Sequence, residues 1–265
     1  MSPGAQAPRL HGTERLAVGD FGVELMPKAI LEVCAFNIQS CLVAQKAGAS
    51  RVELCDNPTE GGTTPSYGTL KRTREKVSLR LYPLLRPRAG NYYYDDDELA
   101  ILREDIRVCR ELGCDGISIG AQRVDGRIDT ERMKEFVELA GPMGVTCNRA
   151  FDATPDMFQA LEDLIDAGCE RVLTSGQASG APEAGRILGA LVKAAGDRII
   201  VMPGAGIRAS NIGRLMEESG AREFHGSVRR PTANPMTHGN PNVLDFGNVY
   251  LPDEQELASI LAQLK

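Results

Sequence analysis

Two short apolar segments of the sequence each carry a carboxylate and a thiol two residues apart. The first pair is Glu32 and Cys34 in "LEVCAF", and the second is Glu53 and Cys55 in "RVELCD". Because side chains alternate across a β-strand, the members of each pair would share one face of a strand. If the two strands are neighbours and the sulfurs converge, the thiols can hold a soft ion such as Cu(I). The alternative, which spacing alone favours, is that both thiols are simply buried, as free cysteines commonly are. The two carboxylates can divide the roles of acid and base.

Charged and polar side chains also follow the ends of several other apolar segments. An isolated buried charge is costly, so these groups should pair with one another or face a polar pocket. The candidates for acid–base chemistry are Glu32, Glu53, Asp152 and His225. The candidates for binding an anion are Arg86, Arg88, Arg149, Asn148, Ser175, Gly204, Gly206 and Ser227. The alternative for the charged members is a structural ion-pair network.

Glycine turns late in the sequence add to the anion-binding hypothesis. In "PGAGI", Gly204 and Gly206 let backbone N–H groups approach an anion, and a helix is predicted to begin near Ser210 and Asn211. A lone G-x-G is a weak signal, because turns between strands and helices commonly need glycine. Its position after the seventh predicted strand strengthens it, since barrels often bind phosphate there.

The elements that would position these residues follow a repeating order of amphipathic helix, glycine and strand. Helix-closing glycines are predicted at positions 48, 113, 144, 168, 196 and 220. One clear helix follows Asp95–Asp97, whose charges suit a helix N-terminus. Another is predicted to begin with Thr154 as N-cap and to bury Phe158, Leu161 and Ile165.

Eight apolar strands alternate with these helices. They are predicted at 31–36, 51–55, 79–85, 116–120, 145–149, 171–174, 198–202 and 222–226. This order predicts a single (β/α)8 TIM-type barrel, with the active face at the C-terminal ends of the strands. The alternative is an open doubly wound sheet, but the G-x-G-x-x-G turn after its first strand is missing.

The two ends of the chain are expected to lie outside this repeat. Residues 1–28 are predicted to be an extension that is either disordered or not native, and residues 29–265 form the barrel domain. From about residue 229 a segment rich in Pro and Asn is predicted to wrap the barrel as an irregular loop. A final amphipathic helix, "DEQELASILAQLK", then docks on the outside.

Composition narrows the class of protein. The net charge is −6 with dispersed basic residues, which argues against nucleic acid as a partner, and no segment is apolar enough to span a membrane. The seven cysteines show no C-x-x-C spacing, so we expect free thiols in a cytoplasmic protein. Cys109, Cys114 and Cys169 are predicted to pack as small apolar residues, whereas Cys147 lies nearer the active face.

Several segments, taken in order, closely resemble the CutC family of copper-homeostasis proteins. They are "LEVCAF", "RVELC…EGGTTPS", "RPRAGNYYY", "RAFD", "ERVLTSGQ", "VMPGAGI" and "EFHGS", between about residues 30 and 230. The resemblance implies a cytoplasmic TIM-type barrel that forms a homodimer or larger homo-oligomer. It further implies Cu(I) as the bound metal, with Cys34 and Cys55 as ligands. The chain departs from the family at Asn148, where members usually have His, and at Gly226, where Cys is frequent.

Two functions are therefore open. The first is Cu(I) binding in copper homeostasis, which the family resemblance favours. The second is an enzyme that acts on a small anionic metabolite, phosphorylated or a carboxylate, at the mouth of the barrel. This second function is favoured because the chain keeps the Glu, Arg and Gly residues of the pocket while it departs from the family at Asn148 and Gly226. The sequence indicates no organic cofactor.

Overall fold

The computed structural model describes residues 29–233, 235, 236, 238, 242 and 248–265. The predicted extension, residues 1–28, lies outside the described residues. Among the described helices, none combines the length and apolar character that crossing a bilayer requires.

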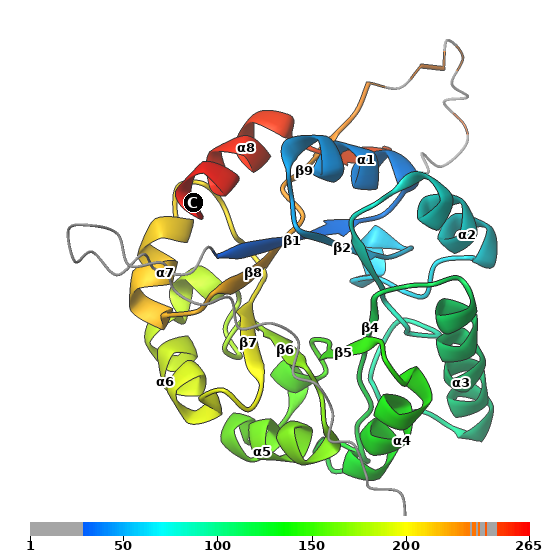
Figure 1. The fold of residues 1–265 in the computed structure, drawn as a ribbon, viewed down its shortest axis with the longest axis vertical. Coiled ribbons are helices and arrows are strands. Elements are labelled where there is room, and N and C mark those ends of the chain that lie inside the picture. Colours follow the sequence, from blue (N-terminus) through cyan, green and yellow to red (C-terminus); the bar gives the residue numbers. More distant parts are fainter. Residues whose placement is uncertain (1–28, 234, 237, 239–241, 243–247) are drawn as a thin grey trace, which may run out of the picture.

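Eight parallel strands form a closed barrel, as predicted (Figure 1). They pair as two four-stranded sheets, in the orders β3-β2-β1-β8 and β4-β5-β6-β7. Single bridges close the two seams, one between Leu84 and Ser118 and one between Gly204 and His225. The closed ring excludes the open doubly wound sheet. The strands are β1 (Ile30–Ala35), β2 (Arg51–Leu54), β3 (Arg80–Pro83), β4 (Gly116–Ile119), β5 (Gly144–Cys147), β6 (Arg171–Thr174), β7 (Ile200–Pro203) and β8 (Glu223–Gly226).

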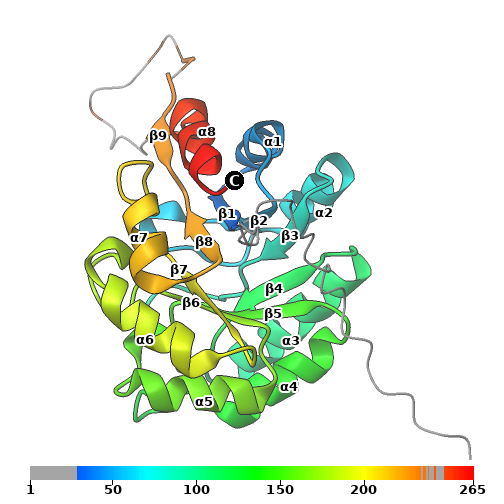
Figure 2. The same cartoon turned by 60° about the vertical axis from the view of Figure 1, so that its left-hand side comes forward.

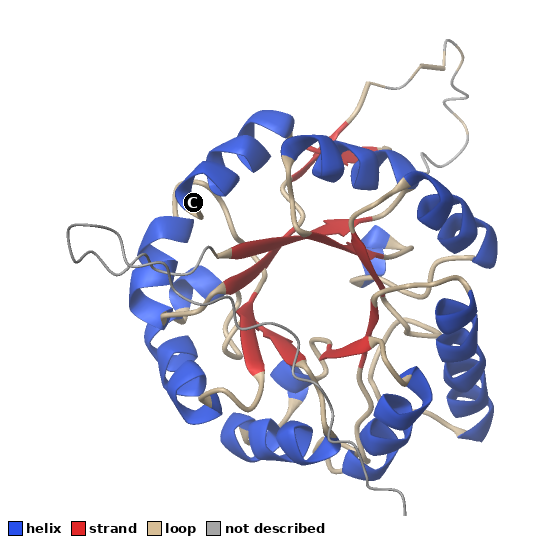
Figure 3. Ribbon diagram, viewed as in Figure 1, coloured by secondary structure: helices blue, strands red, loops and turns tan. Residues whose placement is uncertain are grey.

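Helices surround the strands on the outside of the barrel (Figure 3). They are α1 (Ile38–Ala47), α2 (Tyr67–Lys76), α3 (Asp96–Glu111), α4 (Thr130–Ala140), α5 (Met157–Ala167), α6 (Gly185–Ala195), α7 (Ile212–Ser219) and α8 (Glu254–Gln263). Short 3-10 turns lie at Pro58–Glu60, Phe151–Ala153 and Ala181–Glu183. The final helix α8 packs against α1 and α7, as expected for the terminal segment (Figure 2).

The C-terminal segment adds two short strands that the sequence did not indicate. β9 (Arg229–Pro231) and β10 (Tyr250–Pro252) pair as an antiparallel ribbon. Most of the residues between them lie outside the described part of the chain. The ribbon brings the chain back to the barrel, so that Asp253 caps the N-terminus of α8.

Local signals predicted some helix ends well and others wrongly. Asp95 forms a capping box with Glu98 at the start of α3, as its acidic residues indicated. The predicted N-cap Thr154 is wrong, because Asp156 accepts the backbone N–H groups of Phe158 and Gln159 at the start of α5. This shift by two residues turns Phe158 outward, where it is 42% exposed.

The predicted cap Gly144 instead lies in β5, and Gly141 closes α4. A Cβ on Gly144 would lie 2.5 Å from the Tyr82 Oη and 1.9 Å from a Glu170 oxygen. Glycine is therefore required there by a side chain from another strand rather than by a helix end.

The apolar faces of the strands pack outward against the helices, whereas the barrel interior contains a buried ionic network. The Arg51 Nη2 lies 2.6 Å from the Glu223 Oε2, and the Arg171 Nε lies 3.0 Å from the same oxygen. Both guanidiniums stack on the ring of Tyr82, at 5.1 and 5.2 Å from its centroid. Arg51 also pairs with Glu32. Each charge of this network is thus compensated by a neighbour of opposite sign, as burial in low dielectric requires.

Breaking this network should destabilise the fold strongly. Glu223→Gln removes the carboxylate that two buried arginines share, so we expect the free energy of unfolding to fall by about 3–5 kcal/mol. Urea unfolding measures the loss. Glu104→Gln is the control, because its ion pair with Arg107 is exposed and should contribute less than about 1 kcal/mol. Equal losses in the two variants would contradict the prediction.

Candidate functional site at the barrel mouth

The mouth of the barrel brings together most of the residues singled out in the sequence. A cavity of about 370 Å³ opens at the C-terminal ends of the strands. We call it the carboxylate chamber, because Glu53, Glu60 and Asp152 line it. Its lining also includes Cys34, Arg86, Tyr92, Asn148, Arg149 and His225.

A second cavity of about 190 Å³ adjoins the first. Its lining shares Cys34, Gly61, Arg149 and His225 with the carboxylate chamber, so the two are parts of one mouth. We call it the arginine chamber, because its lining contains arginines and no carboxylate. Its other lining residues include Gly206, Arg208, Ser227 and Arg229.

The two thiols converge, as the strand arrangement suggested. Cys34 on β1 is paired in register with Glu53 on β2, and Cys55 follows at the end of β2. The Cys34 and Cys55 sulfurs are 3.9 Å apart, and the Cys55 Sγ lies 3.4 Å from the Glu53 Oε2. Among the described residues, Cys34, Glu53 and Cys55 form a group whose ligand atoms all lie within 4.8 Å of one another.

His225 connects this group to the ionic network below it. Its Nδ1 lies 2.8 Å from the Glu32 Oε1, and its Nε2 lies 3.7 Å from the Glu53 Oε2. Glu32 is buried behind His225 and lines neither chamber. Its position makes it an orienting partner of the imidazole rather than a group that meets a ligand.

The surroundings set unusual protonation states. The hydrogen bond from Cys55, helped by His225, lowers the pKa of Cys34 to about 5. Burial raises the pKa of Glu53 to about 8. Burial alone would lower the pKa of His225, but the charge of Glu53 and hydrogen bonds to Cys34 and Glu32 raise it well above its ordinary value. These shifts favour a Cys34 thiolate beside a His225 imidazolium near neutral pH.

Arg86 is a buried cation with no carboxylate partner among the described residues. Its guanidinium donates to the carbonyl oxygens of Glu60, Gly62 and Gly90 at 2.8, 2.9 and 2.6 Å, and it stacks on Tyr92. Its Nε makes no hydrogen bond with a described residue. The positive charge of Arg86 therefore remains uncompensated at the wall of the carboxylate chamber.

Asn148 also leaves a donor without a partner at this wall. Its Oδ1 accepts the Ala150 N–H at 2.9 Å, but its buried Nδ2 has no partner among the described residues. A buried donor of this kind is costly unless a ligand or water accepts from it.

Asp152, by contrast, is already engaged. It accepts hydrogen bonds from the Thr174 hydroxyl at 2.5 Å and from the backbone N–H of Ser175 at 3.0 Å. It also pairs with the Arg149 Nε at 2.8 Å, and Arg149 donates to the Ser175 hydroxyl at 3.1 Å. These contacts make Asp152 and Ser175 the support that holds Arg149.

Three of the predicted anion-binding residues, Arg88, Ser175 and Gly204, line neither chamber. Arg88 was predicted to bind an anion, but it pairs with Glu98 and donates to the Tyr93 carbonyl oxygen. Gly204 lies beneath the mouth, where a Cβ would be 2.4 Å from Leu173 and 3.2 Å from the His225 Cβ.

The sequence reasoning missed Arg208 and Arg229, which line the arginine chamber. Arg208 lies five residues after the end of β7, and Arg229 lies three residues after the end of β8. This position after a strand end could have identified them as candidates for the site. Both side chains are exposed, so the criterion of a charge within a buried segment did not identify them.

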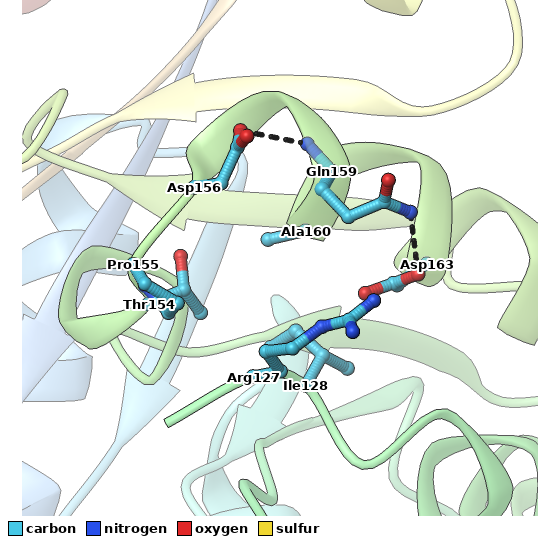
Figure 4. A pocket seen from close by; sticks show the side chains of 8 residues that line it. All are labelled: Arg127, Ile128, Thr154, Pro155, Asp156, Gln159, Ala160 and Asp163. Carbon is cyan, nitrogen blue, oxygen red and sulfur yellow. Dashed lines mark hydrogen bonds between the residues drawn. The ribbon is translucent and has the colours of Figure 1, made fainter. Parts of the chain in front are cut away.

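Another cavity, of about 270 Å³, lies between the loop before α4 and the start of α5 (Figure 4). In it Gln159 donates to Asp163 at 3.0 Å, and Arg127 and Thr154 lie nearby. No thiol or imidazole lines it. The unusual protonation states and the uncompensated arginine are found at the mouth instead.

The fold and the mouth define a TIM-type barrel that carries a thiol pair and buried acid–base groups at the C-terminal ends of its strands. The chain belongs to the CutC family, whose model matches residues 29–230. A CutC family protein from Chromobacterium violaceum is 49% identical over 209 residues, which cover 79% of this chain and 85% of that protein. A CutC family protein from Xanthomonas campestris is 46% identical over 220 residues, which cover 83% of this chain and 92% of that protein.

A solved structure is also similar to this chain. It is described as a copper homeostasis protein, CutC, from Streptococcus agalactiae. It superimposes with a TM-score of 0.72 and 34% sequence identity, and the match covers 75% of this chain and 98% of that chain.

The lowered pKa of Cys34 can be measured directly. Its alkylation by iodoacetamide should be half-maximal near pH 5, because the thiolate is the reactive form. In Cys55→Ala the largest cause of the shift is removed, so the midpoint should rise toward the ordinary value of about 8.5. Peptide mass spectrometry after brief alkylation separates Cys34 from the other cysteines. A midpoint that stays the same in Cys55→Ala would contradict this account.

Proposed function

We propose that the chain binds Cu(I) through Cys34 and Cys55 and thereby takes part in copper homeostasis in the cytoplasm. The observation that carries this proposal is the 3.9 Å separation of the two sulfurs. Two thiolates that each lie about 2.3 Å from a metal ion can be up to about 4.6 Å apart. The pair therefore fits one ion with little movement, and soft thiolates select Cu(I).

The protonation states also fit this ligand set. Cys34 is already a thiolate near neutral pH, whereas burial raises the pKa of Cys55 well above its ordinary value. Binding must therefore release the Cys55 proton.

Removing both thiols should abolish the site. We expect one equivalent of Cu(I) in an anaerobic competition titration of the wild type and none in Cys34→Ala/Cys55→Ala. Glu53→Gln should weaken binding by about 10- to 100-fold, because a carboxylate beside the ligands is lost. The matched control is Cys114→Ala/Cys169→Ala, whose thiols are also buried but lie at the other end of the barrel. Equal affinity in the wild type and Cys34→Ala/Cys55→Ala would remove the proposal.

A second function is favoured by a different observation. Arg86 is a buried cation without a carboxylate partner among the described residues, and it lines the same chamber as Glu53. The pKa of Glu53, about 8, suits a general acid or base near neutral pH. We propose that the mouth also binds a small organic anion and that Glu53 exchanges a proton with it.

This second function can be tested with a mixture of small carboxylates and phosphate esters followed by NMR. Wild-type protein should convert at least one compound, and Glu53→Gln should lower kcat by about 10²- to 10⁴-fold, since proton transfer is lost. The control is Glu104→Gln, a surface substitution far from the mouth. Conversion at an equal rate by Glu53→Gln would exclude Glu53 from the reaction, and no conversion by the wild type would contradict the second function.

A further inference from the structure

The arginine chamber carries more positive charge than its surroundings compensate. Arg149, Arg208 and Arg229 line it, and its lining includes no carboxylate. Arg149 is neutralised by Asp152 on the side of the carboxylate chamber. Neither Arg208 nor Arg229 forms an ion pair with a described residue, so two charges remain.

Arg229 is held in place without being neutralised. Its guanidinium stacks on Phe36 and Tyr250, at 5.1 and 5.5 Å from the ring centroids. It also donates to the Pro58 carbonyl oxygen at 3.3 Å. These contacts come from the turn after β1, from β10 and from the loop after β2, so the ribbon described above helps to fix the cation. A guanidinium fixed in this way loses less freedom when it binds an oxyanion.

To the same chamber, the loops after β7 and β8 contribute lining residues whose backbone N–H groups have no acceptor among the described residues. Gly206, Ile207 and Ser227 line it, and none of their N–H groups donates to another described residue. Ile207 is only 2% exposed, so its N–H needs an acceptor that the described protein does not supply. Asn211 fixes this loop by accepting the Arg208 N–H and donating to the Gly206 carbonyl oxygen, both at 2.9 Å.

We propose that the arginine chamber binds the phosphate group of a small phosphate monoester, whose other end lies over Cys34 and Glu53. Two uncompensated arginines match the two charges of a phosphate better than the single charge of a carboxylate. Several backbone donors suit its oxygens. Cys34, Arg149 and His225 line both chambers, so one ligand can occupy both. This inference rests on the second proposed function and names its substrate class.

The test is calorimetric titration of the full chain with inorganic phosphate, glycerol phosphate and glycerol at low ionic strength. Both phosphates should bind and glycerol should not. Arg208→Gln and Arg229→Gln should each weaken phosphate binding by about tenfold or more. The control is Arg214→Gln, on α7 but outside the arginine chamber, which should bind as the wild type does.

Two further variants separate this inference from the proposed functions. Cys55→Ala, which removes one proposed Cu(I) ligand but lines neither chamber, should still bind phosphate, whether or not it has lost Cu(I). Glu53→Gln should also bind phosphate, even where turnover is abolished. No phosphate binding by the wild type, or unchanged binding in both Arg208→Gln and Arg229→Gln, would overturn the inference. If Arg208→Gln and Arg229→Gln both turned over a phosphate ester with unchanged KM, the inferred phosphate site would be wrong. The proposed enzymatic function would then still hold.

Discussion

The interaction on which the rest of the structure depends is the pairing of Glu32 with both Arg51 and His225. Arg51 belongs to the ionic network that fills the lower barrel, and His225 belongs to the mouth. Although burial favours the neutral acid, Arg51 and His225 lower the pKa of Glu32 to about 2, so Glu32 stays charged. A charged Glu32 stabilises the imidazolium, which in turn stabilises the Cys34 thiolate. The charges that stabilise the fold and those that prepare the site are therefore one connected system.

The barrel could be predicted from the sequence because its signals are local. Apolar strands, amphipathic helices and acidic first turns such as that of α3 each depend on a few neighbouring residues. The pairing of Cys34 with Cys55 followed as well, once two adjacent parallel strands were assumed. Gly144 could not be assigned from its neighbours, because the side chains that require a glycine there are distant in sequence: Tyr82 lies on β3 and Glu170 directly precedes β6.

The site was predicted less completely for a related reason. Alternation along a strand predicts which way a side chain points only while the strand lasts. Arg86 and Arg88 both follow the end of β3, and the loop turns one toward the chamber and the other toward Glu98. Arg208 lies in the loop after β7 and Arg229 begins β9, and the closed barrel places both at one cavity. The spacing of residues along the sequence does not predict which loop side chains share a cavity.

The register of β1 and β2 has a consequence for the chemistry of the thiols. Cys34 lies opposite Glu53, so Cys55 is two residues further along its strand. With ordinary strand spacing and rise, the two Cα atoms are about 8 Å apart. A disulfide needs Cα atoms within about 7 Å, so oxidation to a bond would require the backbone of the barrel to move. The same register leaves the two sulfurs 3.9 Å apart. The strands therefore hold the thiols in contact at their sulfur atoms and too far apart at the backbone to form cystine.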